Sequence, residues 1–179
     1  MRVKSIQFIM TKSRLRQHLM RVQLLCVGRL KSGPESVLAT RYLDRAAAIG
    51  RTIGFSPIES RETGESRATR PDDRKREEAK AIQTLLPPRT AVLVFDENGT
   101  EMTSLSFAVE LRRARDEGLV NAVCVIGGPD GLDENFLAEA SCTVSFGRMT
   151  WPHQLVRVMA AEQLYRAMTI LSAHPYHRA

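Results

Sequence analysis

The sequence predicts an α/β fold in which a mainly parallel sheet carries helices on both faces. From residue 20 onward, short apolar runs alternate with longer segments that have helical periodicity. The apolar runs, such as "VQLLCVG" at 22–28, lack polar alternation, as is typical of strands covered on both faces. This alternation of element types indicates parallel strands joined by helical crossovers.

Five segments read as strands, because each is short, apolar and bounded by turn residues. Gly28 ends the first of them, and a glycine-rich turn ends the fourth, which begins at Asn121. The predicted strand segments are 22–28, 53–60, 90–99, 121–131 with its terminal turn, and 142–147.

Between these strands we expect helices over 35–50, from Asp72 to Leu86, over 104–118, over 134–140 and over 152–173. Asp72 or Asp73 is the expected cap of the second helix and Ser104 that of the third. The expected buried stripes of the first and last helices are Val37, Leu38, Tyr42, Leu43 and Ala46, and Leu155, Met159, Leu164, Met168 and Leu171. The charged, Ser/Thr-rich stretch before Asp72 reads as a mobile loop.

The 179 residues suit one domain with a real core, and the net charge of +6 is unevenly distributed along them. Residues 1–19 hold Arg2, Lys4, Lys12, Arg14 and Arg16 and no acid, so the rest of the chain is nearly neutral. We expect 1–19 to be a dispensable basic extension, with a transit peptide as the alternative, and 20–179 to be a single domain. A nearly neutral body does not by itself indicate nucleic-acid binding.

The sequence contains neither a membrane-spanning stretch nor a cysteine-pair motif. No stretch approaches the roughly 20 apolar residues of a membrane span. The cysteines Cys26, Cys124 and Cys142 lie in apolar or small-residue runs without a C-x-x-C pair, so we expect free thiols in a reducing cytoplasm.

Ligands of parallel α/β sheets bind at the carboxyl ends of strands, which here are "DENG" (96–99), "IGGPDG" (126–131) and "FGRMTWPH" (146–153). The paired Gly127 and Gly128 let backbone approach a ligand, but no P-loop lysine or G-x-G-x-x-G spacing accompanies them. A ligand loop and a simple tight turn both remain open. Met149 and Trp151 either line a pocket or fill the core.

The sequence does not favour a metal site. Asp96 and Glu97 have only Asp130 as a plausible partner, and His174 and His177 lack the two further ligands that zinc needs. Glu162 and Arg166 stand four residues apart, which predicts a surface ion pair.

Two stretches together are similar to a known family: "VIGGPDGL" (125–132) and "TWPHQLVRVMAAEQLYRAMTILSAHPYHRA" (150–179). They resemble the SPOUT methyltransferases that methylate N3 of a pseudouridine in bacterial large-subunit (23S) ribosomal RNA. The likeness runs from about Met20 to Ala179 and is dense over 121–179. It implies S-adenosylmethionine as cofactor, a homodimer, and a C-terminal trefoil knot in which the last helix threads a loop. The cofactor-binding residues that it implies are Phe95, Gly127, Gly128, Gly147, Arg148, Met149, Thr150, Trp151 and Pro152.

Chemistry of this kind needs positioning and a base but no metal, because a sulfonium methyl is already activated. The neutral imide nitrogen must lose a proton, and His153, Tyr176 and His177 are candidate bases, as is a solvent-linked group. Arg166 and Arg178 are candidates for stabilising the developing imidate or for gripping phosphate. The tail "HPYHRA" (174–179) is then expected to be a substrate-facing wall, with a structural tail or a metal clip as alternatives.

The expected partner is large-subunit ribosomal RNA, recognised on an assembled ribosome, because a nearly neutral body suits recognition by shape. The basic residues of segment 61–76 suggest an RNA arm, with a solvated charged loop as the alternative; they are Arg61, Arg67, Arg70, Arg74, Lys75 and Arg76. Two competing functions stay open: a non-catalytic ribosome- or RNA-binding protein with the same fold, and a generic nucleotide-binding α/β domain.

Overall fold

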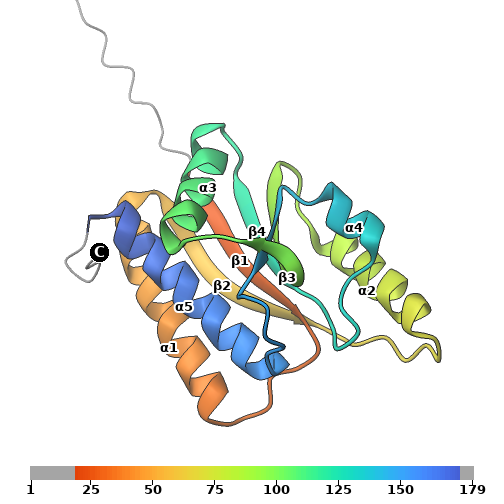
Figure 1. The fold of residues 1–179 in the computed structure, drawn as a ribbon. Helices are drawn as coiled ribbons and strands as arrows, with labels where there is room; N and C mark the ends of the chain where they lie inside the picture. Colours follow the sequence, from red (N-terminus) through yellow and green to blue (C-terminus); the bar gives the residue numbers. More distant parts are fainter. Residues whose placement is uncertain (1–18, 174–179) are drawn as a thin grey trace, which may run out of the picture.

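The computed structural model describes residues 19–173, which form a five-stranded sheet in the order β2-β1-β4-β3-β5 (Figure 1). Every pairing between neighbouring strands is parallel, which confirms the predicted sheet. The strands are β1 (Met20–Val27), β2 (Phe55–Thr63), β3 (Thr90–Glu101), β4 (Asn121–Ile126) and β5 (Cys142–Ser145).

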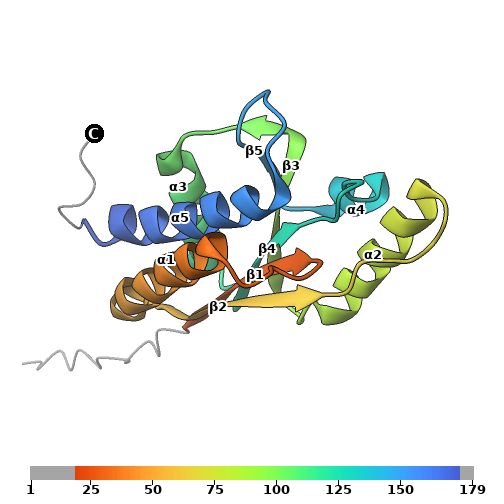
Figure 2. The same cartoon turned by 90° about the horizontal axis from the view of Figure 1, so that it is seen from below.

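Helices cover both faces of this sheet, also as predicted. They are α1 (Pro34–Gly50), α2 (Pro71–Leu85), α3 (Ser104–Asp116), α4 (Glu134–Glu139) and α5 (His153–Leu171), with a short 3₁₀ turn η1 (Arg51–Ile53) after α1. Figure 2 shows α1, α3 and α5 on one side of the strands and α2 and α4 on the other. The core is accordingly split into two apolar clusters, one under each set of helices.

Strand β3 is longer than expected and crosses close to the end of β5. Phe95 and Thr100 both stand in register with Val144, so the intervening residues bulge out of the sheet. A Cβ at Gly99 would lie 2.7 Å from the carbonyl carbon of Val144, a separation that requires glycine there. The trefoil knot itself stays a prediction of the family resemblance.

Two predicted stripes are shifted. Val37 and Leu38 of α1 are 70% and 39% exposed, because the residues that α1 buries are Ala39, Leu43, Ala46 and Gly50. These residues recur every three or four positions, which leaves Val37 and Leu38 off the buried side. In α5, Leu164 and Met168 are fully buried as predicted, but Leu155 is 40% exposed.

The boundaries around α2 and α3 correct the expected caps. Arg70 precedes α2 and Pro71 is its first residue, so Asp72 and Asp73 lie inside the first turn, where their charge favours the helix dipole. Thr103 rather than Ser104 caps α3, since its hydroxyl accepts a hydrogen bond from the Ser106 amide at 3.1 Å.

The charged segment that follows residue 60 is more ordered than predicted. β2 continues to Thr63, pairing with β1 up to Val27. β2 lies at the edge of the sheet, where charged side chains are tolerated because they can reach water. Only 64–70 lies between β2 and α2 without regular structure.

The cysteines are free, as expected, and Cys26 and Cys124 are buried whereas Cys142 is partly exposed. Burial raises the pKa of the Cys26 thiol to about 12, so it stays protonated. No helix within residues 19–173 has the length and apolar character needed to cross a membrane. Residues 1–18 lie outside the described part, and the predicted extension remains a prediction.

Candidate functional site

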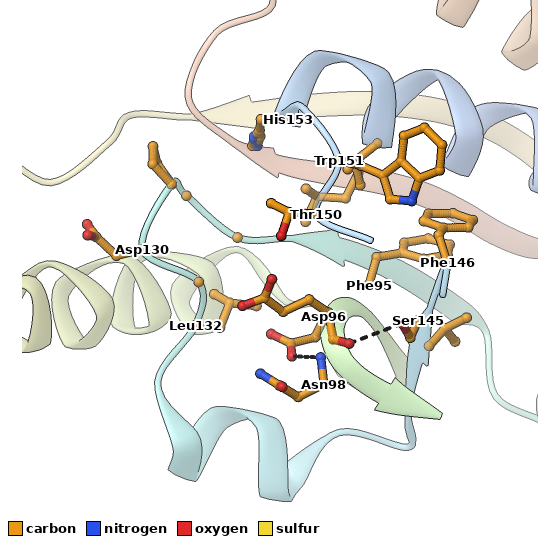
Figure 3. A pocket seen from close by; sticks show the side chains of 18 of the residues that line it. Phe95, Asp96, Asn98, Asp130, Leu132, Ser145, Phe146, Thr150, Trp151 and His153 are labelled. Carbon is orange, nitrogen blue, oxygen red and sulfur yellow. Dashed lines mark hydrogen bonds between the residues drawn. The ribbon is translucent and has the colours of Figure 1, made fainter. Parts of the chain in front are cut away.

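A cavity of about 460 Å³ opens where three neighbouring strands end (Figure 3). Its walls come from the bulged part of β3 (95–98), from the end of β4 and the turn after it (126–132), and from the end of β5 and the loop after it (144–147, 149–151 and 153). Lys75, Glu134, Leu137 and Val156 complete the lining. The three strand-end loops chosen from the sequence therefore meet at one site. This is the edge at which parallel α/β sheets bind ligands.

One end of the cavity is aromatic. The rings of Phe95 and Phe146 are stacked, with centroids 4.9 Å apart and planes 7° from parallel. Trp151, which is 39% exposed, lies at the same end (Figure 3). Flat apolar surfaces of this kind suit the ring of a planar ligand.

Another part of the cavity wall is polar and is held in shape by short local hydrogen bonds. The Asn98 amide donates to Oδ1 of Asp96 at 2.9 Å, within the bulge of β3. The Ser145 hydroxyl lies 3.1 Å from the carbonyl oxygen of Glu97 and accepts a hydrogen bond from the Gly147 amide. Ser145 thus joins the bulge of β3 to the loop after β5.

The glycine turn, residues 127–131, is tight because of what packs behind it. A Cβ at Gly127 would lie 2.6 Å from Cγ of Leu132, and a Cβ at Gly128 would lie 2.5 Å from Oε2 of Glu78. The Gly131 amide donates to the Gly128 carbonyl at 3.0 Å, and Gly131 has a φ of +84° that favours glycine. The turn is tight, as one interpretation of the glycine pair holds, and it also lines the cavity. That it binds a ligand stays a prediction.

Asp130 forms an ion pair with Arg74 of α2. Nε and Nη2 of Arg74 donate to its two carboxylate oxygens at 2.6 and 3.0 Å. This pairing holds the pKa of the Asp130 carboxyl below its usual range. Within residues 19–173 no group of three or more His, Cys, Asp or Glu side chains is arranged to hold a metal ion.

His153 lines the cavity at the first residue of α5. Burial lowers the pKa of its imidazole, and the nearby positive charge of Arg157 lowers it further. Its Nε2 is buried without a hydrogen-bond partner in the described part of the chain. The ring is therefore neutral around neutral pH and can accept a proton.

Seven of the nine predicted cofactor-binding residues line the cavity: Phe95, Gly127, Gly128, Gly147, Met149, Thr150 and Trp151. Arg148 and Pro152 do not line it, and both are exposed. Met149 and Trp151 therefore line a pocket and do not fill the core. The role of all nine in binding the cofactor stays a prediction.

The candidate catalytic residues are more scattered. Arg166 does not line the cavity; it forms the predicted ion pair with Glu162, with Nη2 2.6 Å from Oε1. Tyr176, His177 and Arg178 lie outside the described residues, as does the His174–His177 pair considered for a metal.

Two buried charged residues were not predicted from the sequence. Arg157 and Glu78 are 5% and 4% exposed, although both belong to residue types that are almost never buried unless paired. A signal was present, because each lies on the apolar side of its helix, four residues before Ala161 and Ile82 respectively. A charge at such a position indicates an internal ion pair or hydrogen-bond network.

Fold and site together are those of an α/β protein of the ligand-binding class, with an aromatic-lined cavity at the ends of neighbouring strands. The sequence matches the model of the family described as predicted SPOUT methyltransferase over residues 20–177. The chain belongs to that family, and it is an S-adenosylmethionine-dependent methyltransferase.

Among curated proteins, it is 54% identical over 160 residues to a protein from Beijerinckia indica, covering 89% of this chain and all of the relative. It is 55% identical over 159 residues to one from Methylocella silvestris, covering 89% of this chain and 99% of the relative. Each relative is named ribosomal RNA large subunit methyltransferase H. Among solved structures, a probable methyltransferase from Bordetella pertussis matches with a TM-score of 0.49 at 18% identity, covering 85% of this chain and 98% of that one.

Proposed function

We propose that the cavity at the ends of β3, β4 and β5 binds S-adenosylmethionine and that the chain methylates N3 of a pseudouridine in large-subunit (23S) ribosomal RNA. The observation that carries this proposal is the meeting of the three predicted loops in a single cavity of a SPOUT methyltransferase. The names of its relatives support ribosomal RNA as the substrate.

The cavity fits the cofactor in size and chemistry. Its volume of about 460 Å³ lies within the range of about 300–1,000 Å³ that is typical of small-molecule sites. Phe95, Phe146 and Trp151 offer surfaces for the adenine ring, and the carboxylates of Asp96 and Glu97 suit a ligand with a net positive charge. When bound, S-adenosylmethionine supplies an activated methyl group.

The chain's own residues must then orient the target base and take its imide proton. His153 is the first candidate for this role, because it lines the cavity with a neutral ring whose buried Nε2 has no hydrogen-bond partner among the described residues. Tyr176 and His177 are the other candidates. Arg166 and Arg178 are proposed to stabilise the developing negative charge or to hold phosphate.

An RNA-binding surface is proposed on the segment 61–76. Arg61, Arg67, Arg70 and Arg76 are exposed, as phosphate contacts require, whereas Lys75 lies at the cavity wall. Arg74 is instead turned inward to Asp130. The four exposed arginines belong to a segment that reaches the cavity wall at Lys75, which supports a role in placing RNA at the cavity.

The chain is proposed to act as a homodimer in the cytoplasm. Exposed apolar side chains at the beginning of two packed helices support the dimer: Val37 and Leu38 in α1, and Trp151 and Leu155 at the start of α5. The tail 174–179 is proposed to face the substrate in its own or the partner's site. Analytical ultracentrifugation tests the oligomeric state, since a monomer at micromolar concentration would overturn it.

The decisive experiment is transfer of labelled methyl from S-adenosylmethionine to intact ribosomes that lack the modification, with naked ribosomal RNA alongside. Label on N3 of a pseudouridine in ribosomal RNA of the ribosomes, and little on naked RNA, is the expected result. If the protein bound the cofactor tightly but transferred no label, the proposed substrate would be overturned. No label and no cofactor binding would favour the non-catalytic RNA-binding protein.

A further inference from the structure

The glycine turn 127–131 is held from behind by two side chains of one helix. Arg74 and Glu78 stand four residues apart on α2, so they project from the same side of it. Arg74 binds both carboxylate oxygens of Asp130 at one end of the turn. Glu78 lies against Gly128 near the other end, close enough that a Cβ there would meet its Oε2 at 2.5 Å.

The same two side chains also hold the segment 64–70. Nη1 of Arg74 donates to the carbonyl oxygens of Ala68 and Thr69 at 3.0 and 2.9 Å. Oε1 of Glu78 accepts a hydrogen bond from the Ser66 amide at 2.9 Å. Each side chain therefore contacts the cavity wall with one end of its polar group and the segment with the other.

Neither contact resembles an ordinary surface ion pair. Glu78 is 4% exposed, and burial raises the pKa of its carboxyl. The side chains of Arg74 and Asp130 are 26% and 29% exposed. Arg74 donates to both carboxylate oxygens, and this bidentate geometry is the strong, directional form of an arginine–carboxylate pair. Such contacts fix the relative positions of the groups that they join.

We propose that Arg74 and Glu78 are positioning residues that couple the segment 64–70 to the glycine turn, so that cofactor binding and the ordering of the segment reinforce each other. Neither residue touches a reacting atom in this scheme. The proposal rests on the proposed function in one respect: the ligand at the turn is S-adenosylmethionine. Exposed Arg67 and Arg70 flank Ala68 and Thr69, whose carbonyl oxygens bind Arg74. RNA bound to these two arginines therefore contacts the same segment that Arg74 and Glu78 join to the glycine turn.

The test compares Arg74→Gln with Lys80→Gln. Lys80 lies on the same helix and is exposed, so its replacement removes the same charge without touching the glycine turn. Affinity for S-adenosylmethionine is titrated by the fluorescence of Trp151, the single tryptophan of the chain. Amide hydrogen exchange over 64–70 is measured with and without cofactor.

In the unsubstituted protein, the cofactor is expected to slow exchange over 64–70. Arg74→Gln is expected to weaken cofactor binding by about tenfold, to speed exchange over 64–70 without cofactor, and to abolish the cofactor-dependent protection. Lys80→Gln is expected to change none of these. Unchanged affinity and retained protection in Arg74→Gln would overturn the proposal.

Two controls keep the outcomes distinct. Arg74→Lys retains the charge but carries only three N–H donors, all on one nitrogen, so it cannot make the four hydrogen bonds of Arg74 and is expected to fall between the other two variants. Equal behaviour of Arg74→Lys and the unsubstituted protein would mean that charge alone matters and would overturn the positioning role. If the unsubstituted protein bound no S-adenosylmethionine, the proposed function would fail, while faster exchange over 64–70 in Arg74→Gln would still establish the tether.

Discussion

Nη1 of Arg157 lies 2.7 Å from Oε1 of Glu62, which joins α5 to the end of β2 across 95 positions of the chain. Nη2 of Arg157 donates to the carbonyl oxygens of Val27 and Gly28 at 2.8 and 3.0 Å. The same Glu62 oxygen accepts a hydrogen bond from the Leu30 amide. Arg157 therefore ties the beginning of α5, where the cavity loop ends, to the ends of β1 and β2.

Replacing Arg157 with Met is expected to lower the free energy of unfolding by about 2–3 kcal/mol, because the buried carbonyls of Val27 and Gly28 lose their donor. Urea unfolding followed by circular dichroism measures this change. Arg112→Met, at an exposed position of α3, is the matched control and should change stability by less than about 0.5 kcal/mol. Equal stability of the two variants would contradict the anchoring role.

Gly99→Ala is expected to destabilise the protein by about 1–3 kcal/mol and to weaken cofactor binding. The three atoms nearest to the new Cβ would be backbone atoms of Thr143 and Val144, so no side-chain rotation relieves these contacts. The strand segment that bears Asp96 and Asn98 would have to move away from β5. Gly64→Ala, where a Cβ meets nothing within 4 Å, is the control. Thermal unfolding and Trp151 fluorescence report the two effects, and a wild-type profile for Gly99→Ala would show that the crossing tolerates a side chain.

Phe146→Ala is expected to raise the dissociation constant for S-adenosylmethionine by about tenfold, because it removes one of the two stacked rings at the aromatic end of the cavity. Leu105→Ala, which removes an exposed apolar side chain of α3, should leave binding unchanged. Isothermal titration calorimetry measures both. An unchanged constant for Phe146→Ala would place the cofactor elsewhere.

The lowered pKa of His153 predicts a pH dependence of stability. The relevant pH window runs from the ordinary histidine pKa of about 6.5 down to the lower pKa of His153 in the folded chain. Within this window His153 is protonated in the unfolded chain and neutral in the folded chain. The contribution of His153 to the free energy of unfolding therefore rises as pH increases through that window and is constant above it. The difference between the unsubstituted protein and His153→Gln isolates this contribution from that of Glu78, whose raised pKa acts in the opposite direction. A difference that does not vary between pH 5 and about 7 would contradict the lowered pKa.

Removing residues 174–179 is expected to leave cofactor binding largely intact and to abolish methyl transfer, because the proposed role of this tail is toward the substrate. Calorimetry with S-adenosylmethionine and methyl transfer to ribosomes separate the two effects. Replacing Tyr176 or His177 singly, by Phe and Gln respectively, then identifies which side chain matters. Undiminished turnover in the truncated protein would remove the tail from the active site.

Much of this architecture was predictable from local patterns. Apolar runs without polar alternation identified the parallel strands, and the rule that ligands bind at strand ends selected the loops at 96–99, 126–131 and 146–153 before their convergence was known. Resemblance to a family added the cofactor. Errors arose at boundaries such as Asp72 and Ser104, because the helix caps fall instead at Arg70 and Thr103.

The sequence by itself determined the element order, the sheet type and the chemical character of the strand-end loops, because these depend on short-range periodicity and on turn residues. Only the tertiary structure decided which charges are internal and why the glycines are needed. Arg157 meets Glu62 and Gly128 meets Glu78 across long stretches of chain. Contacts between residues so far apart depend on how strands and helices pack, and no local pattern encodes their partners.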